Sequence, residues 1–358
     1  MTVREIRRAI DEAIHIVRSG DYDPTILNVR THGNLTLLNY TDKASYRGMW
    51  TPWLRVCRGL VIDSENNLVS LPLVKFFNLN EHDETSPAHL ADKTVRCVCE
   101  KADGVMIQVF HHEGELVFAS RHGIWTRAAV IASQLAGGCI QLPEGYTMVA
   151  ELLHNEVWQP GMCTPPAQPA LVILYLRDLS TLELIPAVEF YSHLEPPLRL
   201  PQQYPVYSID EAVQLVEMAE HADWEGVVVQ YTHGYGNLLV KLKSPEYLKR
   251  LASVRGMTTN RMLRTYLEGG LEALRATVAE VEEFLVYLPH VQELIARIES
   301  LERQVTEQAQ RYAGLGRARV LDIPPPWRWT VSYTGDKFNR SIRKIVVREM
   351  ENSGWAHT

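Results

Sequence analysis

The first 245 residues alternate short apolar runs with polar turns, a pattern that predicts β-strands. Residues 2–19, 127–135 and 210–221 instead place apolar side chains at helical spacing, and Gly20 follows the first of these segments as a helix-ending residue. Runs of strands with scattered helices are typical of an α+β domain built on antiparallel sheets. The predicted strands are 35–38, 59–63, 68–71, 105–110, 116–119, 147–153, 171–176, 226–230 and 238–242.

The pattern changes near residue 245, where helical spacing replaces the strands. One apolar stripe runs over 271–285, and a second follows Pro289 over 291–305. Because the proline interrupts the register of a long coiled coil, the stripes favour packed helices of a small all-α domain. Residues 323–327 contain three consecutive prolines and predict an extended connector. The sequence therefore predicts two domains, at 1–245 and 246–358.

Composition and charge narrow the class of protein only slightly. No stretch approaches the 18 apolar residues of a membrane span, and the five cysteines form no C-x-x-C pair, so we expect reduced thiols and a cytoplasmic location. The net charge of −7 is unevenly distributed along the chain. From Glu246 onward there are 17 lysines and arginines and 14 acidic residues, whereas the residues before it include 19 lysines and arginines and 29 acidic residues. A mildly basic C-terminal third permits a contact with nucleic acid but does not identify one.

The segment Glu100-Lys101-Ala102-Asp103-Gly104 carries the most chemical information in the chain. A lysine is a weak nucleophile at neutral pH unless burial or nearby cations lower its pKa from about 10.4. A nucleophilic Lys101 therefore predicts further cations, carboxylates for a metal ion, and a nucleotide pocket. Alone, K-x-D-G arises by chance in on the order of one protein in ten of this length.

Two acidic residues stand at strand positions that suit a buried site. Glu225 precedes Gly226 at the start of an apolar strand, and a carboxylate is a preferred ligand of Mg²⁺. Glu151 interrupts the apolar strand 147–153, where a buried lone carboxylate is unfavourable unless it is paired or liganded. An edge-strand acid that faces water remains an equal alternative for Glu151.

Two lysines alternate along the last predicted strand. Lys241 and Lys243 share one strand face, from which they could meet charge that develops on a phosphate and lower the pKa of Lys101. An exposed edge strand that carries lysines is the alternative interpretation.

In this order the clusters resemble the covalent nucleotidyltransferase superfamily of ATP-dependent ligases and capping enzymes. More narrowly, residues 35–250 are similar to the bacteriophage RNA ligase 1 family, the single-strand tRNA-repair type. Two positions depart from the family pattern: Arg121 stands where a lysine is usual, and Val105 stands where a serine is common. The narrower likeness rests on Cys57-Arg58-Gly59-Leu60, on Lys75-Phe76-Phe77-Asn78-Leu79-Asn80-Glu81, and on Val240-Lys241-Leu242-Lys243-Ser244 with Tyr247 after it.

The resemblance implies an ATP-dependent RNA ligase that joins 5′-phosphate and 3′-hydroxyl RNA ends. The reaction would pass through a covalent lysyl-AMP intermediate and an adenylated RNA 5′ end. Lys101 would accept the AMP, and Lys241 and Lys243 would act on the α-phosphate. The further positions are Arg58 and Lys75 at the phosphates of ATP, Arg121 and Glu151 at the nucleoside, Asp103, Gly104 and Tyr40 elsewhere in the ATP site, and Glu225 at the metal.

The resemblance also implies an architecture and partners. Residues 1–245 would form an adenylation domain of antiparallel sheets with flanking helices, which uses ATP and Mg²⁺ or, as a substitute, Mn²⁺. Residues 246–358 would form a helical appendage for RNA such as tRNA, although its basic tail equally suits a solvated helix face. That tail comprises Lys337, Arg340, Arg343, Lys344 and Arg348.

Other functions stay open at this point. The helices after residue 245 disfavour a DNA ligase or an RNA-capping guanylyltransferase, because those enzymes continue into a β-barrel. A catalytically retired RNA-binding module would lack the lysine or the metal acid, and both are present. The chain has no G-x-x-x-x-G-K-[ST] motif, so we expect a separate end-healing kinase and phosphatase, in a bacterial or phage-infected cytoplasm.

Overall fold

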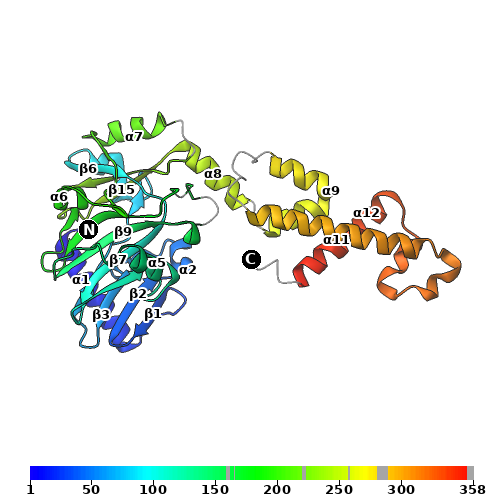
Figure 1. The fold of residues 1–358 in the computed structure, drawn as a ribbon, viewed down its shortest axis with the longest axis horizontal. Helices are drawn as coiled ribbons and strands as arrows, with labels where there is room; N and C mark the ends of the chain where they lie inside the picture. Colours follow the sequence, from blue (N-terminus) through cyan, green and yellow to red (C-terminus); the bar gives the residue numbers. More distant parts are fainter. Residues whose placement is uncertain (159–161, 165, 220–222, 257–258, 280–288, 353–358) are drawn as a thin grey trace. The chain divides into compact units, whose positions relative to one another are not determined.

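The computed structural model describes residues 1–158, 162–164, 166–219, 223–256, 259–279 and 289–352 (Figure 1). The chain divides into two compact units, residues 1–248 and 249–358. Three mainly antiparallel sheets build the first unit, and helices build the second. The α+β class that the sequence predicts, with a helical C-terminal region, is confirmed.

The first sheet has four antiparallel strands in the order β1-β2-β3-β4. The outer face of α1 is polar, and its buried face, which includes Ile6 and Ile10, packs in one cluster with residues of α3 and of this sheet. Thr2 and Glu5 form a capping box at the start of α1, and Gly20 ends it with a φ of 70°. The bounds are β1 Leu27–His32, β2 Leu35–Tyr40, β3 Arg58–Asp63, β4 Leu68–Ser70, α1 Val3–Ser19, α2 Asp42–Tyr46 and α3 Pro52–Val56.

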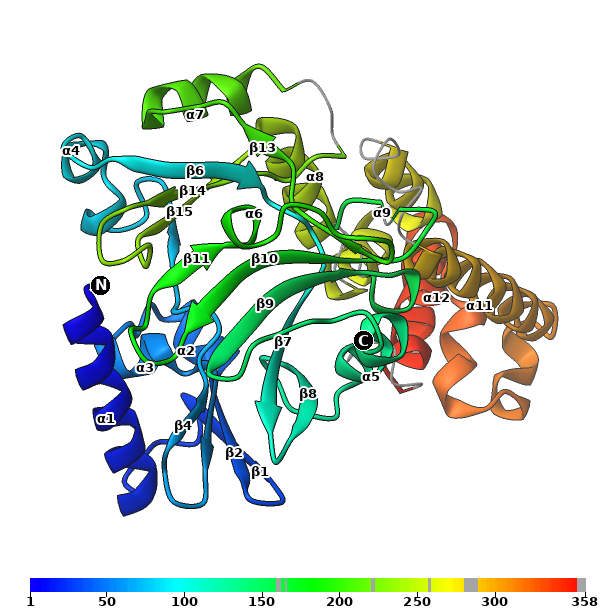
Figure 2. The ribbon, with the colours of Figure 1, turned by 60° about the vertical axis from the view of Figure 1, so that its left-hand side comes forward.

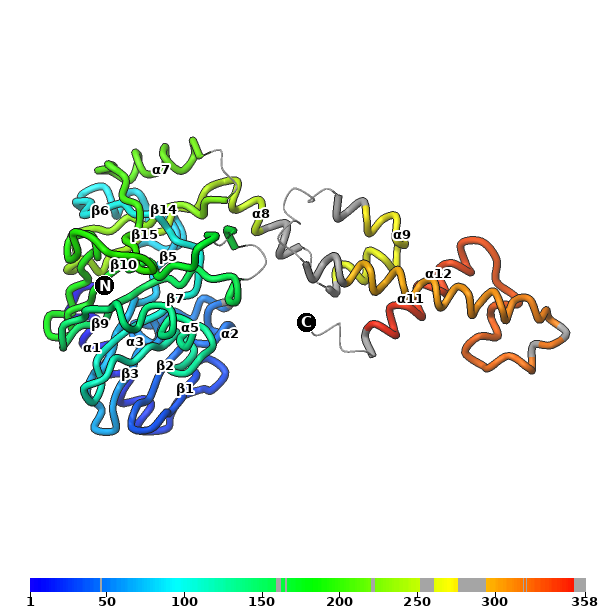
Figure 3. Tube along the Cα trace, in the orientation of Figure 1, coloured from blue at the N-terminus to red at the C-terminus, as the bar shows by residue number. Residues whose placement is uncertain are grey.

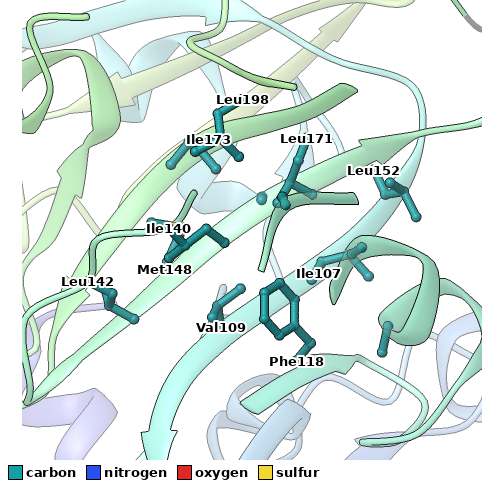
Figure 4. Close-up of a cluster of buried hydrophobic side chains, with 14 of the residues drawn as sticks. Ile107, Val109, Phe118, Ile140, Leu142, Met148, Leu152, Leu171, Ile173 and Leu198 are labelled. Carbon is teal, nitrogen blue, oxygen red and sulfur yellow. The ribbon is translucent and has the colours of Figure 1, made fainter. Parts of the chain in front are cut away.

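The second sheet runs β11-β10-β9-β7-β8, and β12 pairs with β10 in parallel (Figure 2). Side chains of β7, β8, β9 and β10, among them Ile107 and Leu171, pack with α5 in one hydrophobic cluster (Figure 4). The bounds are β7 Val105–His112, β8 Glu115–Ser120, β9 Tyr146–Leu153, β10 Ala170–Asp178, β11 Leu184–Pro186, β12 Leu198–Arg199, α5 Arg127–Ala136, η2 Asn155–Val157 and α6 Ala187–Phe190.

The third sheet runs β13-β6-β14-β15-β5. A smaller apolar cluster joins it to the second sheet, with Met106 and Tyr175 from one sheet and Val228 and Leu239 from the other. The bounds are β5 Phe77–Asn78, β6 Val95–Glu100, β13 Gln203–Tyr204, β14 Gly226–Tyr231, β15 Leu239–Lys243, η1 Asp83–Thr85, α4 Pro87–Leu90, α7 Ile209–Glu217 and α8 Pro245–Gly256.

All nine predicted strands are present, but the sequence pattern does not predict β6, the strand that leads into Lys101. Its segment reads Val-Arg-Cys-Val-Cys-Glu, and the charge of Arg96 interrupts the apolar run. Arg96 is accommodated because Glu183 and Glu189 accept its hydrogen bonds at 3.0 and 2.7 Å. Those acids lie 87 and 93 positions away in the sequence, so a local pattern cannot include them.

The second unit is built of helices (Figure 3). They pack around one apolar core, which includes Tyr266, Leu294, Ile298 and Val346. The predicted stripe over 271–285 extends into residues 280–288, which lie outside the described residues. No helix in the described ranges is both long enough and apolar enough to cross a membrane. The bounds are α9 Thr259–Ala279, α11 Pro289–Ala313, η3 Arg317–Asp322, η4 Pro325–Val331 and α12 Gly335–Asn352.

The prediction of an extended connector at 323–327 is wrong, because the 3₁₀ helix η4 begins at Pro325. Proline suits the first turn of a helix, where its missing N–H leaves no hydrogen bond unmade. The turn also stacks the rings of Trp327 and Trp329, with centroids 6.4 Å apart, and places Trp329 against Phe338. Aromatic packing therefore outweighs the extended preference of the prolines.

Two glycines allow the second and third sheets to close on the segment that joins them. Gly226 has a φ of 139°, and a Cβ there would collide with the backbone of Leu242 and Lys243. A Cβ on Gly104 would meet the carbonyl oxygen of Leu152 and lie 2.8 Å from Leu153 Cδ2. Backbone atoms cannot move aside as a flexible side chain can, so both positions require glycine.

We expect Gly226→Ala to lower the free energy of unfolding by about 2 kcal/mol or more, through backbone strain and the collision. The measurement is urea unfolding. Gly138→Ala is the matched control, since a Cβ there meets nothing within 4 Å, and it should stay within about 0.5 kcal/mol of wild type. Equal stability of the two variants would contradict this account of Gly226.

Candidate active site

Lys101 lies in the short link between the third sheet and the second. Its backbone N–H donates to the carbonyl of Gly226 at 2.9 Å, directly after β6 ends. The preceding Glu100 accepts two hydrogen bonds from Arg199, at 2.7 and 2.9 Å, and another from the backbone of Gln202. These contacts fix the position of the chain at Lys101.

A cleft between the two sheets receives the Lys101 side chain. Four predicted site residues line it together: Arg58 from β3, Lys101, Glu151 from β9 and Lys241 from β15. Its apolar walls include Phe76, Met106, Leu174 and Val228. Residues from all three sheets therefore meet at one place.

Glu225 holds two of the predicted lysines at once. Its Oε2 lies 2.5 Å from Nζ of Lys101, and its Oε1 lies 2.8 Å from Nζ of Lys243. The Glu225 side chain is 2% exposed. Burial alone would raise the pKa of Glu225, but the two lysines outweigh burial and hold the pKa below its usual value.

The prediction that neighbouring cations lower the pKa of Lys101 is wrong for the free protein. Burial does act in that direction, but Glu225, Glu151 and Asp103 outweigh it and raise the pKa of Lys101 above its ordinary value. The lysine with a strongly lowered pKa is Lys241, through burial first and then through repulsion by other cations. Local sequence could not give this sign, because Glu225 and Glu151, the two strongest of these charges, lie far from Lys101 in the sequence.

A cluster of cations adjoins the cleft. Burial and then repulsion by Arg58 and Lys75 lower the pKa of Lys241, and burial likewise lowers that of Lys75. Burial would raise the pKa of Tyr40, yet Arg58, Arg121 and Lys75 together lower it. Such mutual repulsion is relieved when an anion binds, so the cluster suits phosphate groups.

Aromatic rings support these cations. The Lys75 ammonium lies 4.8 Å from the ring centre of Trp50, and that of Lys241 lies 4.3 Å from the ring centre of Phe76. The Arg121 guanidinium lies 5.8 Å from the ring centre of Tyr40. Cation–π contacts stabilise charges that have few acidic partners.

Glu151 does not lie on an edge strand. Its strand β9 runs between β7 and β10, so the interpretation as a water-facing edge acid is wrong. Burial raises the pKa of Glu151 to about 7, although Lys101 and Arg58 oppose the rise. A carboxyl group with this pKa can gain or lose a proton near neutral pH.

Asp103 and Gly104 have different roles in the geometry. Asp103 accepts a hydrogen bond from the backbone N–H of Cys163 at 2.6 Å, and burial followed by the charge of Glu225 raises its pKa. Gly104 allows the backbone of β9 to approach closely.

Val105 starts β7, lies opposite Leu152 and packs against the main core, where a serine would contribute less apolar contact.

The carboxylates fit a metal ion that is shared with a substrate phosphate. The described residues contain no group of three His, Cys, Asp or Glu side chains that could enclose a metal. Mg²⁺ commonly takes one or two carboxylates and completes its shell with phosphates and water. Glu151 could supply one such carboxylate, whereas both oxygens of Glu225, the predicted metal ligand, contact the ammonium groups of Lys101 and Lys243.

The sequence pattern gives no functional role to two residues that shape the site, Met106 and Tyr175. Met106 accepts a hydrogen bond from Nη1 of Arg58 at 3.1 Å, and Tyr175 forms part of the cleft wall. Both lie within apolar strands, and alternation alone assigns them to a core. The signal that could identify them is the pairing of β7, β9 and β10, which sequence spacing does not reveal.

Comparison with known proteins gives related ligases. Residues 56–247 match the family model described as RNA ligase. RNA ligase 1 of bacteriophage TS2126 is 30% identical over 298 residues, which cover 77% of this chain and 72% of that protein. A putative RNA ligase of Thermovibrio ammonificans is 26% identical over 242 residues, 64% of this chain and 62% of that one. Among solved structures, an archaeal ATP-dependent RNA ligase aligns with a TM-score of 0.49 at 16% identity, over 80% of this chain and 79% of that one.

We expect Glu151→Gln to stabilise the protein at high pH. An acid whose pKa rises on folding contributes stability below its unfolded pKa, near 4.5, and that stability is lost as the pH rises toward about 7. Glutamine does not ionise, so the variant should unfold with a free energy on the order of 2 kcal/mol above wild type at pH 8 and equal to it at pH 4. Urea unfolding at the two pH values measures this.

Glu217→Gln, at an exposed position of α7, is the control and should match wild type at both pH values. A stability difference for Glu151→Gln that is the same at pH 4 and pH 8 would contradict the buried, pH-dependent charge.

Proposed function

The chain belongs to the RNA ligase family, of the phage RNA ligase 1 type, and from this membership we propose that it uses ATP to join RNA ends through a covalent AMP on Lys101. The observation that carries the proposal is the position of Lys101. Its ammonium group is paired with a buried acid at the mouth of a cluster of cations. A nucleophile and an anion site are thus adjacent.

In the first step, the Lys101 amine attacks the α-phosphorus of ATP. A P–N bond forms, the bond to the β-phosphate breaks, and pyrophosphate leaves. The free lysine is charged, so a proton must leave it first, and Glu225 Oε2, 2.5 Å from Nζ, is the nearest acceptor. A proton on Glu225 would also weaken the attraction that keeps Lys101 charged.

The cations would bind and orient the triphosphate. Arg58 and Lys241 line the cleft, the charge of Lys75 acts on Lys241, and phosphate charge would raise the pKa of Lys241 back toward its ordinary value. Lys243, held on Glu225, would face the same phosphates. A bound Mg²⁺ or Mn²⁺ would neutralise phosphate charge and help to align the triphosphate.

Two further displacements would complete ligation. The AMP moves from Lys101 to the 5′-phosphate of an RNA end, so the P–N bond breaks and a phosphoanhydride forms. The 3′-hydroxyl of the other end then attacks that 5′-phosphate, a phosphodiester forms, and AMP leaves. Each is an in-line transfer at phosphorus, for which positioning and charge neutralisation dominate catalysis.

We propose the second unit as an RNA-binding appendage. On α12 the cations Arg340, Lys344 and Arg348 are exposed, and they recur at four-residue spacing along one face. Arg343 differs from them, because it is partly buried and its charge acts on Tyr266. The exposed face suits the phosphates of a structured RNA such as a tRNA, prepared by separate end-healing enzymes in the cytoplasm.

We expect wild-type protein to become labelled by α-labelled ATP with Mg²⁺, and then to circularise 5′-phosphorylated single-stranded RNA. Lys101→Ala should lose the label completely because no amine remains to form the P–N bond, whereas Lys43→Ala, at an exposed lysine, should keep it. Labelling by GTP instead would favour a capping enzyme. A labelled Lys101→Ala protein would overturn the assignment of the nucleophile.

The appendage is tested by the salt dependence of RNA binding. We expect Arg340/Lys344/Arg348→Gln to reduce the slope of log K against log salt by about 0.7 for each phosphate that the variant no longer binds, up to about 2. Arg4/Arg8/Arg18→Gln removes the same charge from the exposed face of α1 and should leave the slope unchanged. Equal slopes for the two variants would remove α12 from the RNA interface.

A further inference from the structure

Trp125 is an exposed indole in a fixed position. It is 66% exposed, and its Nε1–H donates to Nε2 of His32, whose ring lies edge-on to the indole with centroids 5.8 Å apart. The neighbours of Trp125 are anchored: Ile124 packs in a buried cluster with Leu35, and Thr126 caps α5. The indole is thus presented to solvent without contributing to the core.

Two arginines, Arg30 and Arg121, lie near the segment that carries this indole. Arg30 and His32 lie on the same face of β1, two positions apart, and Arg30 Nη1 lies 3.7 Å from where a Cβ on Gly123 would stand. Among the described residues neither Arg30 nor Arg121 forms an ion pair with a carboxylate. Burial and then the charge of Arg121 lower the pKa of His122, Asp42 opposes the shift, and Arg30 adds to it, so both guanidinium groups act on that ring.

The surface is continuous with the cleft of Lys101. The Arg121 guanidinium lies over the ring of Tyr40, and the Tyr40 hydroxyl is influenced in turn by Arg58, which lines the cleft. Arg58, Tyr40 and Arg121 therefore connect the cleft to His122, three positions before Trp125. The series suits a chain of phosphates better than a single anion.

Two other exposed aromatic residues, Tyr207 and Tyr235, lack this setting. The backbone N–H of Tyr207 donates to Glu211, and the loop that carries Tyr235 lies beside Arg96, whose charge is neutralised by two glutamates. An acidic or neutralised surrounding does not attract a polyanion. Of these exposed rings, Trp125 is the one that combines a π-face with unpaired arginines.

Given the proposed ligase function, we propose that Trp125, Arg30, Arg121 and His122 bind a single-stranded RNA end on its way to Lys101. An unpaired base stacks on the indole, and the adjoining phosphates contact Arg30 and Arg121. A duplex cannot bind in this way, because its bases are already stacked within the helix. The surface therefore selects for unpaired ends.

The test is a binding titration of a short, fluorescently labelled, 5′-phosphorylated RNA strand. Trp125→Ala should weaken binding about tenfold, because a base loses its stacking partner, and Trp125→Phe should recover most of the affinity. Arg30→Gln should weaken binding and reduce the salt slope by about 0.7, as expected for one phosphate contact. Tyr207→Ala, at another exposed ring, should bind as wild type does.

The outcomes separate this inference from the proposed function. Failure of the wild-type protein to accept label from ATP contradicts the ligase proposal itself. If the label forms but Trp125→Ala and Arg30→Gln bind the strand as wild type does, the RNA surface is overturned. If Trp125→Ala lost as much affinity for duplex RNA as for the single strand, the stacking of an unpaired base on Trp125 would be overturned.

Arg30→Gln leaves the indole in place and so reports on the surface even if Trp125→Ala unfolds. The unfolding midpoint of each variant identifies that case. Weakened binding by folded Arg30→Gln supports the proposal, and unchanged binding overturns it.

Discussion

The triad of Lys101, Glu225 and Lys243, built on a buried carboxylate, is the interaction on which the rest of the site depends. One carboxylate, 2% exposed, accepts contacts from two ammonium groups at 2.5 and 2.8 Å. Removal of either lysine or of the acid would leave a buried charge without full compensation, which is strongly destabilising. The fold meets this constraint with two sheets that close so tightly that Gly104 and Gly226 are required.

The triad also separates charge within the cleft. Acids surround Lys101 and keep it an ammonium in the free protein, whereas Lys241 is repelled by Arg58 and Lys75 as well as by the other lysines of the site. A triphosphate would relieve that repulsion. In this account the resting lysine is protected from unproductive reaction until the nucleotide arrives, and the proton on Lys101 is the one that must move first.

Part of this arrangement could be predicted from the sequence, and the limits have physical causes. Apolar runs predict the strands because several of them are buried on both faces, as β14 is along its whole length. The motif residues gather because paired strands bring Arg58, Lys101, Glu151 and Lys241 to one cleft. The strand β6 is not predicted because distant glutamates neutralise Arg96. The direction of the Lys101 pKa shift is not predicted either, since it depends on the net balance of burial and charges from separate segments.

The Trp125 surface illustrates the same limit. Locally the residue is one apolar position before a helix, and its meaning depends on His32 and Arg30, which are brought beside it by sheet pairing. The local sequence pattern indicates which side chains are apolar enough to be buried. Tertiary structure decides which residues remain exposed together, and that determines what a surface can bind.

The charge state of Lys101 in the free protein tests the central claim most directly. Competitive labelling with a trace of an amine-acylating reagent across pH, read out by peptide mass spectrometry, gives the pKa of each lysine. We predict a pKa for Lys101 above the ordinary value of 10.5 in wild type, and a clear decrease in Glu225→Gln. A pKa at or below the ordinary value in wild type, or no change in Glu225→Gln, would contradict the claim that Glu225 holds the nucleophile in its charged form.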